Sequence, residues 1–455
     1  MAKNVTTTAV RRSSRRLAAV AEELVSGDAV ASASNATTAS EKVHPTASTA
    51  AQPPASAPKP LKNKFVGIHV SASGGPERAI VNSVALGPLA RSLALFIRPR
   101  LLWKPQPPLS EASVDRFHAA LAKTQQQIRL DHVVVHGSYL INFGSHDATL
   151  REKSVTLMVE EVTKCAQLGI QLYVFHPGSC TGDELVEQRK LAKAQSRASK
   201  RSNKKAKLSL ESPSIISFDW DEAHVRRQSI AHVADCVAQV LSQTENVTLV
   251  LESMAGQGHV LGRTFQELRA ILDSVAALYN QQELSKSQGQ RAIQERIGVC
   301  LDTCHAFASG YELRTVNDCE LMMRDFDDYM LPHWTNALKV VHLNDSKTAC
   351  GSNVDRHTNI GQGEIGIEAF RWVMTSSRFE NLPLILETPR AKKPKIPKKS
   401  SVETATETEE VKEIADSKKR KKRVRMAEFV EMQESVEATI PSATQELELL
   451  YSLTT

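Results

Sequence analysis

Residues 297–303 read IGVCLDT, a short apolar run that ends on a carboxylate and is followed by His305. Near-continuous apolar runs of this length are typical of parallel strands that are buried on both faces. Seven further runs of the same type occur along the chain: FVGIHVS (65–71), SLALFIR (92–98), HVVVHG (132–137), QLYVFHPG (171–178), TLVLES (248–253), ALKVVHLND (337–345) and LPLILET (382–388).

Amphipathic stretches of helical period separate these runs, for example KSVTLMVEEVTKCAQLG at 153–169. A strand followed by a helix, repeated eight times, predicts an α/β fold of the (β/α)8 TIM-barrel type. An open, doubly wound sheet is the structural alternative, because it shows the same alternation of strands and helices.

The composition changes outside the segments in which strands and helices alternate. Residues 1–60 are rich in Ala, Ser, Thr and Pro and have no hydrophobic period, so we expect a disordered N-terminal extension. The predicted barrel domain spans 61–390 and contains a basic insertion near 181–215. A second insertion, 391–440, is both basic and acidic, and 441–455 is predicted to form the last helix of the barrel. Both insertions follow strand ends, so both should emerge at the C-terminal face, where barrel enzymes build their sites.

The net charge of +6 is distributed unevenly over the 455 residues. Almost half of the 57 Lys and Arg residues lie in four runs without any acidic residue, whereas acidic residues are in excess elsewhere. Such runs indicate nuclear import signals or nonspecific phosphate contacts; solvated segments without a specific role are the alternative. The four runs are Arg11 to Arg16, Arg189 to Lys207, Lys392 to Lys399 and Lys418 to Arg425.

The N-terminal residues and the cysteines indicate the cellular compartment in which the protein is expected to act. The N-terminal residues are Arg-rich and acid-free, which suits a mitochondrial transit peptide as well as a nuclear signal, but they lack the apolar core of a secretory signal. No apolar run of about 18 residues predicts a membrane span. The seven cysteines are odd in number, scattered and free of CxxC pairs, so we expect reduced structural thiols.

Ligand-type side chains stand at the ends of the apolar runs. A single buried His or Asp is usually a hydrogen-bonded residue of the core. A ring of such residues requires a cation, because unpaired buried charges are costly. Imidazoles combined with carboxylates suit zinc, manganese or iron, whereas Mg²⁺ and Ca²⁺ prefer oxygen alone. The residues are His69, His136, His176, Glu252, Asp302, His305, His342 and Glu387, with Asp355 and His357 beyond the seventh run.

The number of these side chains exceeds what one tetrahedral site can use, which predicts a multinuclear centre. Asp355 and His357 form a D-x-H unit, and positions i and i+2 of an extended segment project to the same side. Clustered metals on a barrel rim suit phosphodiester hydrolysis, because two ions can stabilise the attacking and the leaving oxygen.

Several motifs, in order over about 65–390, resemble endonuclease IV, a family of zinc-dependent endonucleases that cut DNA beside abasic sites. A final helix also fits the resemblance. The motifs are GIHVSASGG (67–75), VVVHGSYLINFG (133–144), FHPGS (175–179), LESMAGQG (251–258), GVCLDTCHAFASGYELRT (298–315), HLNDSKTACGSNVDRHTNIGQGEIG (342–366) and PLILETP (383–389).

This resemblance implies a trinuclear zinc centre, with manganese as an alternative at one site, and it leaves His69 as a pocket residue that binds no metal. All nine ligand positions of the family carry the expected residue. The implied ligands are His136, His176 and Glu252 for the first ion; Glu252, Asp302, His342 and Glu387 for the second; and His305, Asp355 and His357 for the third.

The resemblance also implies the reaction. The phosphodiester 5′ to an abasic site in double-stranded DNA would be hydrolysed, leaving a 3′-hydroxyl and a 5′-deoxyribose phosphate, and blocked 3′ ends would be removed at the same site. Glu252 and Glu387 are the residues expected to hold or orient the hydroxide. We expect a monomer located in the nucleus, and also in mitochondria if the N-terminal segment acts there, with DNA and nuclear import factors as partners.

The DNA-binding loop departs from the family. Family members bend the DNA and place loop side chains in the gap left by the extruded sugar, and Tyr139 matches one such position. After the second run the family carries a polar Asn-Gln-Arg-type stretch before a Trp, whereas residues 98–103 of this chain read RPRLLW. Leucine would then act as the wedge, and Arg98 or Arg100 would reach phosphate; local drift without consequence is the alternative.

Two other functions fit parts of the pattern. A metal-dependent sugar isomerase or epimerase on the same barrel would need only a two-metal site, and the set of His305, Asp355 and His357 argues against it. A catalytically inactive DNA-binding protein would be favoured by missing ligands, and none is missing.

Overall fold

The computed structural model describes residues 61–182, 222–283, 292–390 and 443–454. Eight parallel strands close into a barrel in the order β1-β10-β7-β6-β5-β4-β3-β2. This confirms the predicted TIM barrel and excludes an open sheet. The strands are β1 (Phe65–His69), β2 (Ser92–Leu95), β3 (Val133–His136), β4 (Leu172–Phe175), β5 (Thr248–Glu252), β6 (Ile297–Asp302), β7 (Leu338–His342) and β10 (Pro383–Leu386).

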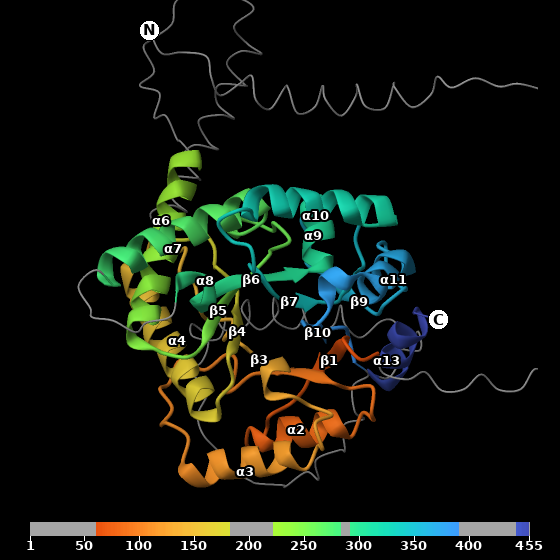
Figure 1. Ribbon diagram of the computed structural model, residues 1–455. Helices are drawn as coiled ribbons and strands as arrows, with labels where there is room; N and C mark the ends of the chain where they lie inside the picture. The colour runs from red at the N-terminus through yellow and green to blue at the C-terminus, as the bar shows by residue number, and fades with distance from the viewer. Residues whose placement is uncertain (1–60, 183–221, 284–291, 391–442, 455) are drawn as a thin grey trace, which may run out of the picture. The chain divides into compact units, whose positions relative to one another are not determined.

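Helices surround the strands (Figure 1). The longer ones are α2 (Glu77–Val84), α3 (Glu111–Ala122), α4 (Ala148–Leu168), α6 (Glu222–Gln243), α7 (Phe265–Glu283), α10 (Val316–Met330), α11 (Ile367–Thr375) and α13 (Ala443–Ser452). Short helical segments are α8 (Ile293–Arg296), α9 (Thr303–Ser309), η1 (Leu130–His132) and η2 (Ser377–Phe379). Beside the barrel, β8 (Asp345–Ser346) and β9 (His357–Thr358) form a two-stranded antiparallel sheet that the sequence pattern did not predict.

The strands are apolar on both faces because one face fills the barrel and the other packs against the helices. Strand β1 contributes Gly67 to the interior, and a Cβ there would lie 1.8 Å from the carbonyl oxygen of Ser92 on β2. The close approach of β1 and β2 therefore requires glycine at this position. Each of the other strands contributes one apolar residue to a buried cluster in the interior: Ala94, Val134, Val174, Val250, Cys300, Val340 and Ile385.

Helix α4 shows how the local sequence sets the element bounds. The Asp147 side chain caps it by accepting hydrogen bonds from the amides of Thr149 and Leu150. The helix ends at Gly169, whose φ of 72° is the left-handed conformation typical of a glycine that terminates a helix. The cap explains why α4 begins before residue 153, where the apolar pattern became clear.

The parallel arrangement brings the ligand-type side chains to a single rim. His136, Glu252, Asp302 and His342 are the last residues of β3, β5, β6 and β7, and Asp302 and His342 are register partners. Because all strands of the barrel run in the same direction, their carboxyl ends meet at one face. The fold itself therefore gathers residues that are widely separated in sequence.

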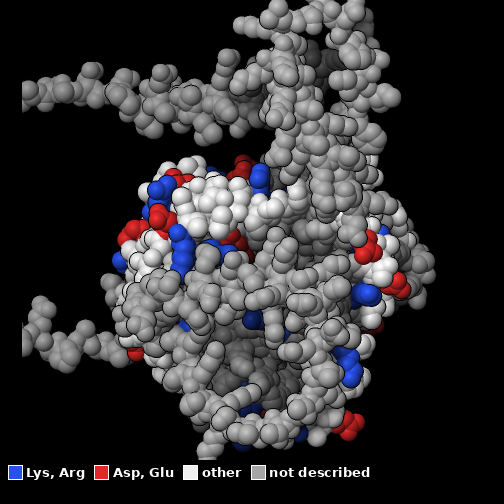
Figure 2. Space-filling model, turned by 180° about the vertical axis from the view of Figure 1, so that it is seen from behind, with Lys and Arg blue, Asp and Glu red and all other residues white. Residues whose placement is uncertain are grey.

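Several predicted segments lie outside the described residues. These are the N-terminal extension 1–60, residues 183–215 of the first insertion and the insertion 391–440. The predicted last helix corresponds to α13. Among the described residues, no helix is long and apolar enough to cross a lipid bilayer. Where Figure 2 shows described residues, basic and acidic side chains lie interspersed on that face.

Candidate metal centre

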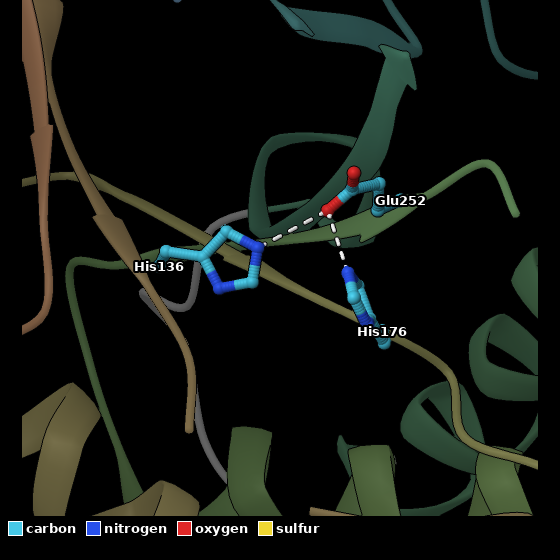
Figure 3. A group of neighbouring side chains, drawn as sticks. All are labelled: His136, His176 and Glu252. Atoms are coloured by element: carbon cyan, nitrogen blue, oxygen red, sulfur yellow. Dashed lines mark ion pairs between the residues drawn. The ribbon is translucent and has the colours of Figure 1, made fainter. Parts of the chain in front are cut away.

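The Glu252 carboxylate lies at the middle of the cluster and is fully buried. Its Oε2 is 3.3 Å from Nε2 of His136 and 3.2 Å from Nε2 of His176 (Figure 3). Its Oε1 is 3.0 Å from Nδ1 of His342. The two oxygens of this side chain thus face different neighbours, which is the geometry of a carboxylate that bridges two cation sites.

A second group lies beside the first and shares Glu252 with it. Nδ1 of His342 is 3.4 Å from Oε2 of Glu387 and 3.9 Å from Oδ2 of Asp302. The donor atoms of this group all lie within 4.8 Å of one another. Its members are Glu252, Asp302, His342 and Glu387.

The third group is the most accessible to solvent. Nε2 of His305 is 3.4 Å from Oδ2 of Asp355, and Nε2 of His357 is 3.4 Å from Oδ1 of the same carboxylate. The side chains of Asp355 and His357 are 32% and 18% exposed. Their two donor atoms face a common point, as the D-x-H spacing predicted.

Cys304 also comes within reach of a cation, together with Asp302 and His357. The sequence pattern did not indicate this thiol as a ligand. Burial raises the pKa of the Cys304 thiol to about 12, and its Sγ donates a hydrogen bond to the carbonyl of Arg356. Because the thiolate is the metal ligand, the hydrogen bond that this thiol donates favours His305 and Asp355 as the partners of His357.

Backbone carbonyls orient two of the imidazoles. Nδ1 of His136 lies 2.9 Å from the carbonyl oxygen of Gly137, and Nδ1 of His305 lies 2.8 Å from that of Ser253. A carbonyl oxygen can only accept, so each Nδ1 carries hydrogen and each Nε2 is directed at a carboxylate of the cluster. This arrangement fixes the tautomer of a metal-binding histidine.

Asp302 is held from both sides. Its Oδ1 accepts a hydrogen bond from the amide of His305 at 2.9 Å and thereby caps α9. Its Oδ2 accepts one from Nδ2 of Asn344 at 2.6 Å, and Oδ1 of Asn344 accepts one from the amide of Glu387 at 2.9 Å. Asn344 is fully buried and links two of the ligand-bearing segments. The sequence pattern did not indicate this residue.

The Glu252 carboxylate keeps its charge although it is buried. Burial alone would raise the pKa of Glu252, but the neighbouring imidazoles of His342 and His176 hold it well below its usual range. Burial opposes the charge on His305, yet Asp302 and Asp355 raise its pKa well above the ordinary value. A charged His305 imidazole would balance the negative charge of these acids, and a divalent cation at the same place would balance it with a neutral imidazole.

Unpartnered polar atoms support the fit of a cation. Oε2 of Glu252 and Nε2 of His305 and His357 are buried without any hydrogen-bond partner. Such atoms are rare in proteins, because each loses its contact with water without compensation. All three belong to the groups described above, and a cation bound within each group would satisfy them.

His69, at the end of β1, lies beside the cluster but belongs to none of the groups. Its ring centre is 4.5 Å from that of Phe96 and 6.2 Å from that of His136. Burial lowers the pKa of His69 to about 4, although Glu387 opposes this shift. His69 is therefore a neutral imidazole beside the cluster.

Exposed side chains line the mouth of the site. Tyr139 is 46% exposed, and its ring stacks on that of His176 at 5.7 Å. The Arg100 guanidinium lies 5.6 Å from the Tyr139 ring centre. Leu101 and Trp103 are 60% and 39% exposed. An aromatic and a basic group thus lie next to the first metal group, and the exposed apolar residues follow Arg100 in the same loop.

Of the two arginines that were predicted to reach a DNA phosphate, Arg98 does not lie on the surface. Its side chain is buried and pairs with Glu160 at 2.9 Å. Its Nη2 donates hydrogen bonds to the carbonyls of Leu102 and Lys104 at 2.5 and 2.8 Å. Arg98 therefore fastens the loop that carries Leu101 and Trp103, and of these two arginines Arg100 is the exposed one.

Known proteins resemble this chain in sequence. Residues 90–414 match the protein family described as a xylose isomerase-like TIM barrel. An apurinic-apyrimidinic endonuclease of Caenorhabditis elegans is 38% identical over 332 residues, which are 73% of this chain and 68% of the nematode protein. Apurinic-apyrimidinic endonuclease 1 of Plasmodium berghei is 35% identical over 72% of this chain, but the match spans only 52% of that longer protein.

The fold is also similar to a solved structure. Endonuclease IV from the bacterium Thermus thermophilus superposes with a TM-score of 0.51 and 26% sequence identity. The match covers 72% of this chain and 93% of the bacterial enzyme.

Proposed function

Because the chain belongs to the endonuclease IV family of apurinic-apyrimidinic endonucleases, we propose that it hydrolyses the phosphodiester 5′ to an abasic site in double-stranded DNA. The products would be a 3′-hydroxyl and a 5′-deoxyribose phosphate, and blocked 3′ ends would be removed at the same site. The observation that carries the proposal is the convergence of three His and carboxylate groups on one barrel rim.

We propose one zinc ion for each group. Mixed nitrogen and oxygen donors suit zinc, with manganese as an alternative at one site. When bound, such ions lower the pKa of a water molecule and stabilise negative charge on phosphodiester oxygens. The unpartnered atoms support cations at two of the groups, because Oε2 of Glu252 faces the first group and the Nε2 atoms of His305 and His357 both belong to the third.

Glu252 and Glu387 would hold and orient the attacking water. Glu252 faces two groups with its two oxygens, and Oε2 of Glu387 lies 3.4 Å from Nδ1 of His342. Both carboxyls have a pKa below the ordinary value because the surrounding imidazoles outweigh the effect of burial. They remain ionised near neutral pH and can accept hydrogen bonds from a water molecule between them.

The rim would engage the DNA. Tyr139 and the loop bearing Arg100, Leu101 and Trp103 lie at the mouth of the site, and Arg100 is exposed. An apolar side chain can fill the gap that an extruded sugar leaves, and a guanidinium can pair with a phosphate. In this proposal Leu101 takes the place of the polar residue that the family usually carries.

Location and partners are also proposed from the sequence. The basic runs within residues 1–60 and 391–440 suit binding to nuclear import factors, so we propose a nuclear enzyme, with an additional mitochondrial address in the Arg-rich N-terminal residues. We propose a monomer, because one barrel supplies all three groups.

Product analysis tests the proposed reaction. Full-length, zinc-loaded protein is incubated with an end-labelled duplex that contains one abasic site, and a DNA polymerase is added afterwards. Hydrolysis on the 5′ side predicts a nicked strand that the polymerase extends directly. A nick whose 3′ end carries a sugar remnant and resists extension would contradict the proposal. An undamaged duplex is the control substrate, and incubation with a ketose tests the isomerase alternative.

A further inference from the structure

Helix α13 carries one carboxylate that is buried in the barrel. Glu446 is 1% exposed, and its neighbours Leu447, Leu450 and Tyr451 pack in the core. The hydroxyl of Tyr451 donates a hydrogen bond to the carbonyl of Lys64 at 3.0 Å, which anchors the helix beside β1. Figure 1 shows α13 next to α11 and β1, at one side of the barrel.

The Glu446 carboxylate receives hydrogen bonds from three separate places. Its Oε2 accepts one from Oγ1 of Thr388 at 2.7 Å and another from Nη1 of Arg390. Its Oε1 accepts one from the amide of Ile360 at 3.1 Å. Arg390 also donates to Oγ1 of Thr388 at 2.7 Å, so Glu446, Thr388 and Arg390 form a closed triangle of polar contacts.

These partners adjoin residues of two metal groups. Thr388 follows Glu387 directly, and Ile360 lies three residues after His357. The two segments also contact each other, since Nδ2 of Asn359 donates to the carbonyl of Pro389 at 3.3 Å. Glu446 therefore holds the backbone that presents a ligand of the second group and the backbone that presents a ligand of the third group.

Packing alone does not require a carboxylate at this position. Burial of a charged group is costly, and an apolar side chain of similar size would fill the same space at less cost. A carboxylate instead imposes geometry, because it must meet three donors at fixed positions. We propose that Glu446 is a positioning residue for the metal centre, acting through Thr388 and Ile360 on Glu387 and His357. This inference rests on the proposed zinc centre.

The release of zinc tests this role without DNA. Full-length, zinc-loaded protein is mixed with a chromogenic chelator, and the release of metal is followed by absorbance. We expect Glu446→Gln to release zinc at least about tenfold faster than the wild type, because loss of a residue that orients ligands commonly costs roughly 10- to 100-fold in metal affinity. Glu448→Gln is the matched control, since Glu448 lies exposed on the same helix.

Two further measurements separate positioning from a general loss of fold. Thr388→Val keeps the shape of the side chain but removes its hydrogen bond to Glu446, so it should also accelerate release. In the abasic-site assay, Glu446→Gln should lower kcat and leave KM for DNA unchanged, and added zinc should restore kcat. If Glu446→Gln does not fold, the rate of zinc release from Thr388→Val tests the inference.

Zinc release from Glu446→Gln and Thr388→Val at the rate of Glu448→Gln would overturn the inference while leaving the zinc centre intact. Wild-type protein that retains no zinc would overturn the proposed centre and the inference together.

Discussion

Nδ2 of Asn344 donates a hydrogen bond of 2.6 Å to Oδ2 of Asp302. The donor is an amide, and the acceptor is a carboxylate that also caps α9 and faces His342. An ion-binding carboxylate that receives a hydrogen bond from a neutral donor keeps its orientation without losing its charge. Asn344 therefore fixes the direction in which Asp302 faces the second group.

Asn344→Asp should disrupt this group. The new carboxylate would lie against Asp302 in a fully buried position, where two like charges repel strongly and one of them takes up a proton. We expect the bound zinc per chain to fall and nicking to decrease at least about tenfold, measured by elemental analysis and the abasic-duplex assay. Asn381→Asp, an exposed change at the opposite end of the barrel, is the control. Full zinc content in Asn344→Asp would refute this role.

The three groups should lose their ions at different rates. Asp355 and His357 are 32% and 18% exposed, whereas Glu252, Asp302 and His342 are fully buried. A chelator should therefore remove the ion at His305, Asp355 and His357 first. Stopped-flow release is expected to show a fast phase that His357→Ala abolishes. Release of all the bound metal in a single phase would argue against different release rates for the three groups.

Arg98 and Arg100 should act differently on DNA. Arg98→Lys keeps the positive charge beside Glu160 but loses the guanidinium that donates hydrogen bonds to the carbonyls of Leu102 and Lys104. We therefore expect KM for abasic DNA to rise, while the salt dependence of DNA binding stays constant. Arg100→Gln should reduce the slope of log affinity against log salt by about one, as expected for one lost phosphate contact. Equal changes of slope in the two variants would show that Arg98 contacts phosphate after all.

The buried Glu161 carboxyl makes stability depend on pH. Burial raises its pKa from the usual 4.5 to about 7, although Tyr173 donates a hydrogen bond to it. The folded state therefore binds this proton more tightly than the unfolded state. The resulting contribution to stability is complete below pH 4.5 and is lost as the pH rises through 7.

Glu161→Gln should remove this contribution to the pH dependence. Denaturant unfolding of the metal-free protein from about pH 4.5 to about pH 8 measures it, and we expect the difference in unfolding free energy between variant and wild type to change across this range. Glu152→Gln, an exposed change on the same helix, serves as the control. A constant difference between Glu161→Gln and wild type would contradict the raised pKa.

Much of the barrel was predictable because its strands are buried on both faces. An apolar run such as IGVCLD needs no information about distant partners to be recognised as a strand. The ligand-type residues were predictable for a related reason: parallel strands end on one face, so a His or Asp at each end must approach the others. His136, Glu252, Asp302 and His342 all follow this rule.

The supporting contacts were not predictable, because their partners are far apart in sequence. Thr388 and Glu446 are 58 positions apart, and Asn344 and Asp302 are 42 apart. The burial of Arg98 was not predictable for the same reason: the sequence shows a charge near an exposed loop, but not the Glu160 carboxylate on α4 with which it pairs. Such contacts depend on the packing of whole elements.

The most direct test of the account is nicking of a duplex with a single abasic site by full-length protein, before and after removal of zinc. We expect zinc-loaded wild type to nick the duplex, chelated protein to lose the activity, and added zinc to restore it. Glu252→Gln should fold and retain less than about a tenth of the activity, because it removes the charge shared by two groups; Glu245→Gln, exposed before β5, should behave as wild type. Absence of nicking by well-folded, zinc-loaded wild type would contradict the account.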